Sequence, residues 1–321
     1  MTNNKSGIPD EPLSKYGQGK LERLLQAGAF VVTAETTPPV SSDPTALLDA
    51  TAELRDWADA VNVTDGAGAK SHMSSLAAAS LLVQANVEPV PQFTIRDRNR
   101  IALQNDLLGA GALGISNILC LTGDNVSAGD QPDATMVMDM DSRGLMALAR
   151  DMRDTCQLPT GRPIGQAPNL FIGAADAPSE PDKQWNAAGI QSKIDAGAQF
   201  FQTQFCFDIP LVRRYMQRLG DEGVLEHAYF LIGIGPIASA KSARWMNQNL
   251  FGVDIPESII DRLDQANDQA AEGRSVCLEL IQELREVSGV SGVHLMGPRV
   301  EKSAAQVIAE SGVLNERPEV A

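Results

Sequence analysis

Short apolar runs alternate with helix-like stretches along almost the whole chain. The first run, FVVTAE at 30–35, ends at Thr-Thr-Pro-Pro, and a helix-like segment opened by Asp43 and Pro44 follows it. Seven further strand-like runs repeat this order, at 60–66, 87–95, 117–124, 169–176, 199–207, 228–235 and 293–297. Such alternation predicts parallel βαβ units, and eight units are the number that closes a (β/α)₈ barrel, also called a TIM barrel.

The spacing between the last two runs is longer than elsewhere and predicts two extra helices, at 256–268 and 269–288. No Pro-, Gly- or Ser-rich linker interrupts the series, so we expect a single α/β domain over residues 19–314. Residues 1–18 are then an N-terminal extension and residues 315–321 a C-terminal tail, both expected to be poorly ordered.

The overall charge restricts the class of partner. The chain has 41 acidic and 26 basic residues, a formal charge of -15, and 43% hydrophobic residues. This balance argues against binding to nucleic acid or to an anionic membrane, because phosphates would be repelled. The polar N-terminus has no signal-peptide core, and no apolar run approaches the ~20 residues needed to span a bilayer. We therefore expect a soluble, cytoplasmic protein.

Function in such a barrel belongs to the carboxyl ends of the strands. The residues predicted at these ends are mostly polar or acidic: Glu35, Thr64, Asp65, Thr94, Asp124, Asp176, Gln204, Asp208, Gly235 and Met296. No His or Cys set has metal-ligand spacing, so no metal site is predicted. The three histidines, His72, His227 and His294, are scattered and are interpreted as structural or solvated.

Two of these carboxylates suggest acid–base chemistry. Glu35 ends an apolar strand, where burial favours the protonated form that a general acid needs. Asp124 ends the fourth strand on the same rim. Two carboxylates in different environments can hold different protonation states at neutral pH.

Glycine-rich and acidic loops offer three further motifs. GAGALG at 109–114 matches G-x-G-x-x-G but follows a helix and precedes a strand, so it is not a dinucleotide fingerprint. DGAGAKS at 65–71 follows a strand. It is either a loop whose backbone amides bind a phosphate or a plain connecting loop. Residues 125–142 form a long loop with four aspartates. Such a loop could bind a divalent cation, but a solvated lid over the active site is the preferred interpretation.

At these positions the sequence resembles the methylenetetrahydrofolate reductase family. The similar segments occur in order: AETTPP (34–39), NVTDGAG (62–68), NILCLTGD (117–124), KIDAGAQFFQTQFCFD (193–208) and GIGPI (233–237). The resemblance implies an oxidoreductase of one-carbon metabolism and methionine biosynthesis. Its reaction would interconvert 5,10-methylenetetrahydrofolate and 5-methyltetrahydrofolate through bound FAD, with NADH or NADPH as electron source.

The same resemblance implies roles for individual residues. Glu35 would be the general acid that opens the five-membered ring, and Asp124 would hold the pterin and tune the flavin. Gln204 would bind folate and nicotinamide in turn, and Arg299 is a candidate for the glutamate tail. The positions implied to contact flavin are Thr64, Asp65, Gln92, Thr122, Gly123, Asp124, Asp176 and Lys193, of which Lys193 suits the diphosphate.

Four positions depart from the family pattern. Gln92 stands for a His, Thr122 for an Arg, Asp176 for a Tyr, and Met296 for an aromatic residue. Three of the four are flavin contacts in the family. Two alternatives to FAD therefore stay open, namely FMN or direct hydride transfer from NADH without flavin. A third is a folate-binding subunit of a larger methyl- or electron-transfer complex fed by a partner protein. A homo-oligomer is equally compatible with the sequence.

Overall fold

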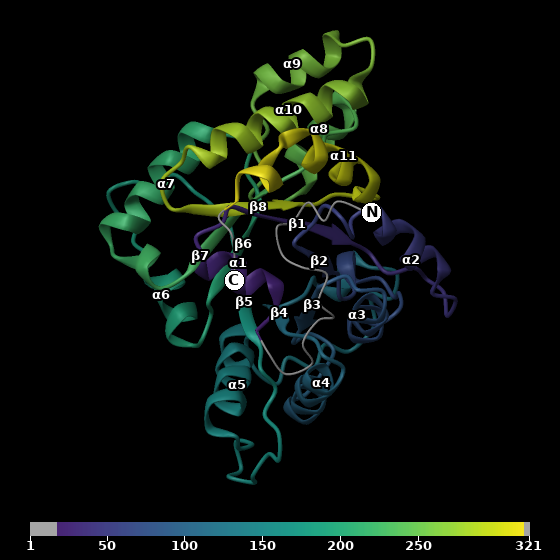
Figure 1. The fold of residues 1–321 in the computed structure, drawn as a ribbon, viewed down its shortest axis with the longest axis vertical. Coiled ribbons are helices and arrows are strands. Elements are labelled where there is room, and N and C mark those ends of the chain that lie inside the picture. Colours follow the sequence, from purple (N-terminus) through teal and green to yellow (C-terminus); the bar gives the residue numbers. More distant parts are fainter. Residues whose placement is uncertain (1–17, 318–321) are drawn as a thin grey trace.

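A computed structural model of the chain describes residues 18–317, and eight parallel strands form a closed barrel in it (Figure 1). The strands follow chain order around the barrel, and the last pairs with the first. They are β1 Val31–Thr36, β2 Ala60–Val63, β3 Pro89–Thr94, β4 Asn117–Leu121, β5 Phe171–Asp176, β6 Phe200–Phe205, β7 Tyr229–Ile234 and β8 Val290–Leu295. The predicted (β/α)₈ barrel is confirmed.

Helices surround the barrel and include the two extra helices predicted between the last strands. They are α1 Lys20–Gln26, α2 Thr45–Ala52, α3 Ser75–Gln84, α4 Arg100–Ala112, α5 Ser142–Thr155, α6 Ala188–Asp195, α7 Ile209–Asp221, α8 Ala240–Asn249, α9 Glu257–Gln265, α10 Gln269–Arg285 and α11 Glu301–Ser311. The additional helix α9 packs against α8 and α10 at one side of the barrel (Figure 1).

The last strand begins three residues earlier than its apolar run suggested. The pattern placed it at 293–297, whereas β8 starts at Val290 and includes Gly292. Gly292 lies beside Val31 of β1, and a Cβ there would come within 2.3 Å of the Val31 carbonyl oxygen. Glycine and serine lower the apparent strand signal of this segment, although the close approach of β1 is what requires the glycine.

Alternation along the strands separates two apolar regions. Outward side chains such as Val32, Val61 and Val293 are buried under the surrounding helices. Inward side chains near the strand starts form a second cluster, which α1 covers with Leu21, Leu24 and Leu25. The inward members of that cluster are Val31, Ala60, Val90, Leu119, Phe171, Phe200 and Leu231. Helix α1, which the pattern did not single out, thus closes the amino-terminal mouth of the barrel.

The chain continues beyond residue 314 in contact with this closed end. Arg317 donates to the Asp59 carboxylate, with 2.7 Å from Nη1 to Oδ1, and Lys20 lies 3.3 Å from the same carboxylate. The described part of the predicted tail, 315–317, therefore includes a buried ion pair. Residues 1–17 and 318–321 lie outside the described residues, so the predicted disorder of both ends stays a prediction.

Candidate active site

Glu35 is the uppermost inward side chain of β1, at the carboxyl-terminal mouth of the barrel. Thr33 lies two residues before it on the same strand and therefore faces the same interior. The Glu35 side chain is 20% exposed, and its Oε2 accepts a hydrogen bond of 3.1 Å from Gln92 Nε2 on β3. The carboxyl group is thus held toward β3 while part of it stays open to the mouth. Gln92, predicted as a flavin contact, thus directly contacts the predicted acid, and its contact with a flavin stays a prediction.

A layer of buried polar side chains lies below Glu35. It consists of Thr33, Asn62, Gln202 and His294, from β1, β2, β6 and β8, and each is at most 3% exposed. Gln202 Nε2 lies 2.9 Å from Asn62 Oδ1 and 3.1 Å from Thr33 Oγ1. Thr33 Oγ1 lies 2.9 Å from His294 Nδ1. We call these four side chains the polar layer.

The other ring nitrogen of His294 faces the predicted acid, with 3.9 Å between Nε2 and Glu35 Oε2. Sequence reasoning did not assign His294 to the site. The parallel register pairs it with Thr33, and strict alternation in VHLMG could have placed it on the inward face. His72 instead bridges Gly66 N and Met73 O, and His227 is exposed.

Asp124 lies in the loop after β4 and meets the loop after β2. Its Oδ2 accepts a 2.7 Å hydrogen bond from Gly68 N, and its backbone oxygen accepts one of 3.2 Å from Arg96 Nη1. Gly66 N donates to His72 Nε2 at 2.9 Å. Amides of the DGAGA loop that could have cradled a phosphate are therefore already engaged inside the protein.

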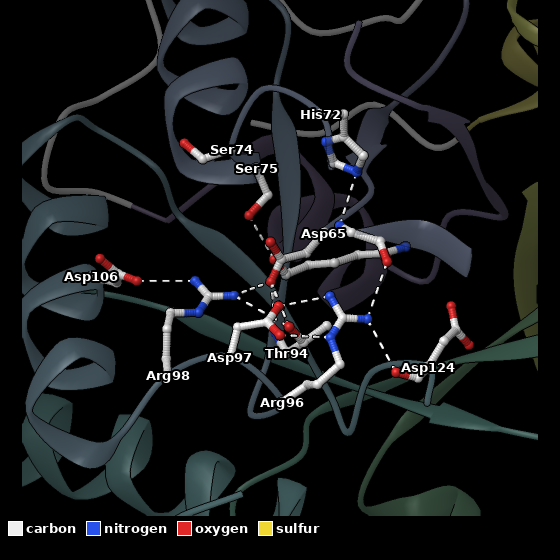
Figure 2. A network of polar contacts seen from close by, with 12 residues as sticks. Asp65, His72, Ser74, Ser75, Thr94, Arg96, Asp97, Arg98, Asp106 and Asp124 are labelled. Carbon is white, nitrogen blue, oxygen red and sulfur yellow. Dashed lines mark hydrogen bonds and ion pairs between the residues drawn. The ribbon is translucent and has the colours of Figure 1, made fainter. Parts of the chain in front are cut away.

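Asp65 is the centre of an ion-paired network shown in Figure 2. Its Oδ2 accepts from Thr94 N at 2.9 Å and forms an ion pair with Arg98, which also binds Asp106 at 3.0 Å. The two arginines of this network, Arg98 and Arg96, were not among the predicted site residues. The signal was the basic segment IRDR, which directly follows the third strand.

Arg96, the second arginine in Figure 2, connects three loops. It pairs with Asp97 at 2.7 Å and donates to the backbone oxygens of Gly66 and Asp124, both at 3.2 Å. The hydrogen bond to Asp97 raises the pKa of Arg96 above its ordinary value, with nearby carboxylates adding to the effect. This side chain therefore stays charged and holds the loops after β2 and β4 together.

On the opposite part of the rim, Asp176 and Lys193 also have internal partners. Asp176 Oδ2 accepts a 2.6 Å hydrogen bond from the Tyr215 hydroxyl, and burial together with this carboxylate raises the pKa of Tyr215. Lys193 Nζ on α6 donates to the Ala175 backbone oxygen at 2.7 Å.

The remaining predicted residues have varied environments. Thr64 is buried, and its Oγ1 has no hydrogen-bond partner among residues 18–317. Gly123 has a φ of +88° and lies against Thr94, where a Cβ would come within 3.0 Å of the Thr94 Cβ. Gln204 donates to the Phe251 backbone oxygen at 3.3 Å. Thr122 and Arg299 are exposed.

The acidic loop after β4 uses two of its four aspartates internally. Asp139 pairs with Arg100 at 2.7 Å, and Asp141 caps α5 through a bond from Gly144 N at 2.8 Å. In the described part of the chain, no group of three or more His, Cys, Asp or Glu side chains is arranged to hold a metal ion.

A parallel barrel with a polar, titratable mouth belongs to the class of (β/α)₈ proteins whose sites lie on the βα loops. Within that class, the family model for methylenetetrahydrofolate reductase matches residues 20–312. The match covers nearly the whole barrel, and the chain belongs to this family.

Individual relatives are distant. A probable methylenetetrahydrofolate reductase (NADPH) of Caenorhabditis elegans is 25% identical over 75% of this chain and 34% of its own length. A 5,10-methylenetetrahydrofolate reductase of Pectobacterium carotovorum is 24% identical over 83% of this chain and 85% of its own length. The match covers between a third and about two fifths of the length of three eukaryotic relatives, from Caenorhabditis elegans, Schizosaccharomyces pombe and Saccharomyces cerevisiae.

A solved structure shares the fold. A Clostridium thermocellum protein, described as binding two copies of 5-methyl-5,6,7,8-tetrahydrofolic acid, superposes with a TM-score of 0.60 at 12% identity. The match covers 91% of this chain and 98% of that one. Among the described helices, none is both long and apolar enough to cross a bilayer. The cytoplasmic location expected from the sequence stays a prediction.

Proposed function

We propose that this protein interconverts 5,10-methylenetetrahydrofolate and 5-methyltetrahydrofolate, with NADH or NADPH as electron source. The observation that carries the proposal is the position of Glu35. Its carboxyl group is partly buried at the barrel mouth, next to Gln92, in a chain that belongs to the reductase family. The folate with a methyl group described for the Clostridium thermocellum neighbour supports the same class of ligand.

The reaction needs one proton and one hydride. In the proposed step, protonated Glu35 gives its proton to N10 of the folate as the bond from N10 to the bridging methylene breaks. The electron pair of that bond stays on N10, and an iminium ion forms between the methylene carbon and N5. A hydride then adds to that carbon and completes the methyl group. Glu35 regains a proton from solvent, and the reverse reaction uses the carboxylate as the base.

Other rim residues would orient the substrate. The exposed Asp124 carboxylate is suited to the N–H donors of the pterin ring, since a carboxylate accepts two parallel hydrogen bonds. With a flavin, Gln204 would contact folate and nicotinamide in turn, whereas in direct transfer it would contact the folate. Exposed Arg299 would meet the glutamate carboxylates.

The electron path has two candidates. Bound FAD, implied by the resemblance, would use Thr64, Asp65, Gln92, Thr122, Gly123, Asp124, Asp176 and Lys193. Three of these groups are bonded within the protein, which weighs against a flavin dinucleotide. Asp65 is paired with Arg98, Asp176 binds Tyr215, and Lys193 donates to a backbone oxygen.

These contacts favour the second candidate, direct hydride transfer from the nicotinamide to the iminium carbon. The amides of the loop after β2 add to the same conclusion, because Gly66 N and Gly68 N are bonded within the protein and are not free for a diphosphate. In this arrangement the two substrates bind together at the mouth, and Glu35 supplies the proton.

An absorption spectrum of the purified protein tests both candidates. Direct transfer predicts a protein without flavin bands that gains none after incubation with FAD or FMN, yet oxidises NADH or NADPH when methylenetetrahydrofolate is present. Flavin bands that bleach with NADH and return with methylenetetrahydrofolate would establish the flavin path and overturn direct transfer. A colourless protein that turns over only after a partner protein is added would instead indicate the subunit of a larger complex. Light scattering on the same sample would report a homo-oligomer.

A further inference from the structure

In the polar layer beneath Glu35, the donor and the acceptor of each hydrogen bond can be assigned from one side chain to the next. Burial of an amide or hydroxyl without a partner is unfavourable, so each donor in such a layer is expected to point at an acceptor. Asn62 and Gln202 form a reciprocal pair, because the Asn62 amide nitrogen donates to Gln202 Oε1 and Gln202 Nε2 donates to Asn62 Oδ1 at 2.9 Å. In the structure the Gln202 amide nitrogen, and not its oxygen, lies toward Thr33.

The second N–H of Gln202 lies between two acceptors, Thr33 Oγ1 at 3.1 Å and His294 Nδ1 at 3.4 Å from Nε2, and the shorter contact is with Thr33. The Thr33 oxygen accepts this bond, and its own hydroxyl hydrogen is left to donate. The acceptor within reach is His294 Nδ1, 2.9 Å away. A neutral imidazole with an accepting Nδ1 carries its hydrogen on Nε2.

We propose that His294 is a positioning residue for Glu35, held by the polar layer in the tautomer whose Nε2–H faces the Glu35 carboxyl. The proposal rests on the proposed function, in which Glu35 alternates between the protonated acid and the carboxylate. The separation of 3.9 Å is longer than a hydrogen bond, and the partly exposed Glu35 side chain closes it as the carboxylate forms. The N–H then stabilises the negative charge left after proton transfer, and it holds the carboxyl group toward the mouth.

The side chains that contact Glu35 and His294 in the polar layer and on β3 carry no charge. Gln92, the other contact of the Glu35 carboxyl, is neutral. Thr33, Asn62 and Gln202 are neutral as well and are at most 3% exposed. The direction of the hydrogen-bond chain, and not a neighbouring charge, therefore sets which ring nitrogen carries the hydrogen.

His72 provides an internal reference with the opposite tautomer. Its Nε2 accepts from the Gly66 amide at 2.9 Å, so its hydrogen lies on Nδ1, which donates to the Met73 backbone oxygen at 2.7 Å. The chain has three histidines, and the third, His227, is exposed. All three can therefore be distinguished in one spectrum.

The first test measures the tautomers directly. The full-length protein is labelled with ¹⁵N-histidine, and nitrogen chemical shifts are recorded at pH 8, with His294→Gln used to assign the His294 signals. We expect protonated Nε2 and unprotonated Nδ1 at His294, and the reverse at His72. A hydrogen on Nδ1 of His294 overturns the proposal. This measurement needs no turnover, so it is independent of the proposed function.

The second test uses Thr33→Val and Thr33→Ser. Valine has nearly the shape of threonine but cannot donate to Nδ1, whereas serine keeps the hydroxyl. Thr33→Val leaves Nδ1 only the longer contact with Gln202 Nε2, at 3.4 Å. We therefore expect the tautomer with hydrogen on Nε2 to lose population and kcat to fall about tenfold, with less than a twofold change in KM for the folate. Thr33→Ser should stay within about twofold of the wild type.

The outcomes separate the two proposals. Equal kcat in Thr33→Val and wild type would overturn the positioning role, even with the tautomer as expected. A wild-type protein with the expected tautomer but no folate turnover would reject the proposed function, and with it the positioning role that rests on it. If Thr33→Val fails to fold, the wild-type spectrum still decides the tautomer, and a hydrogen on Nδ1 of His294 still overturns the proposal.

Discussion

The interior of the barrel changes character along its axis. Near the strand starts it is filled by apolar side chains, including stacked Phe171 and Phe200 with ring centroids 4.9 Å apart, and α1 closes it. Toward the strand ends, amides, hydroxyls, one imidazole and the Glu35 carboxyl take their place. Burial of apolar side chains at the first end stabilises the fold. Burial of polar groups at the other end stabilises it less, but holds those groups in defined orientations. One set of strands thus serves both purposes through a change in its inward residues alone.

The largest expected effect falls on the polar end and concerns rate. Glu35→Gln keeps the shape of the side chain but removes the transferable proton, so folate reduction should fall by roughly a hundred- to ten-thousand-fold. Folate binding, measured by calorimetry, should change little. The control is Glu310→Gln, which alters an exposed carboxylate on α11. Retention of more than a tenth of wild-type activity by Glu35→Gln would reject Glu35 as the general acid.

The next effect falls on the apolar end and concerns stability. Helix α1 acts as a plug at the amino-terminal mouth of the barrel, and its Leu24 is fully buried there. Leu24→Ala should lower the free energy of unfolding by about 2–5 kcal/mol through lost burial and a cavity. Chemical denaturation would measure it, with Leu113→Ala, at a residue 40% exposed, as the matched control. The KM of Leu24→Ala should match the wild type. Equal destabilisation by both variants would contradict the assignment of α1 as a structural plug.

A smaller stability change is expected inside the polar layer. Asn62→Leu leaves the Gln202 amide without its reciprocal partner and should cost roughly 1–3 kcal/mol. Adding Gln202→Leu removes the orphaned amide as well, and we expect the double variant to recover part of this loss. A double variant whose destabilisation equals the sum of the two single variants would show that the pair is not coupled.

The smallest signal is a pH dependence at the apolar end, where Asp59 is buried. Burial opposes its ionisation, but Arg317, Lys20 and the Val32 amide outweigh burial and lower its pKa below the usual value. A carboxylate with a lowered folded-state pKa contributes stability above its unfolded value of about 3.9, and this contribution is lost as the pH falls through the folded value.

Thermal unfolding of Asp59→Asn should therefore differ most from the wild type near pH 7. The difference in Tm should shrink by a few degrees as the pH falls from about 4, where the carboxyl group of the unfolded chain becomes protonated, toward the lower folded-state pKa. A difference that is constant from pH 7 to pH 3 would show that the ion pair with Arg317 does not govern this end of the barrel.

Much of the barrel was predictable because its signal is local. Apolar runs bounded by turns define the strands, and the residue at a strand end is read directly from the chain, as for Glu35 and Asp176. The rejection of the GAGALG motif also follows from local order, since Gly109 and Gly111 lie in the last turns of α4 and Gly114 follows the helix ahead of β4. Helix α1 was missed because a short amphipathic segment has little periodic signal, and its plug role depends on seven strands that come later in the chain.

The partners of the site residues were not predictable in the same way. Asp65 was placed on the rim, but its pairing with Arg98 joins residues from two different loops. His294 was interpreted as structural or solvated because neighbouring residues in the sequence give it no chemical partner. Its contact with Glu35 and Thr33 arises only where the last strand closes onto the first.

Hydrophobic periodicity and chain direction are local properties, so the barrel, the order of its strands and the residue types at its mouth could be predicted from the sequence. Which of those residues meet follows from the three-dimensional fold. Closure brings β1 beside β8, and the adjacent loops after β2 and β4 bring Gly68 N to the Asp124 carboxylate. Hydrogen bonds and ion pairs act over a few ångströms in space, whatever the separation along the chain, and the fold alone sets those distances.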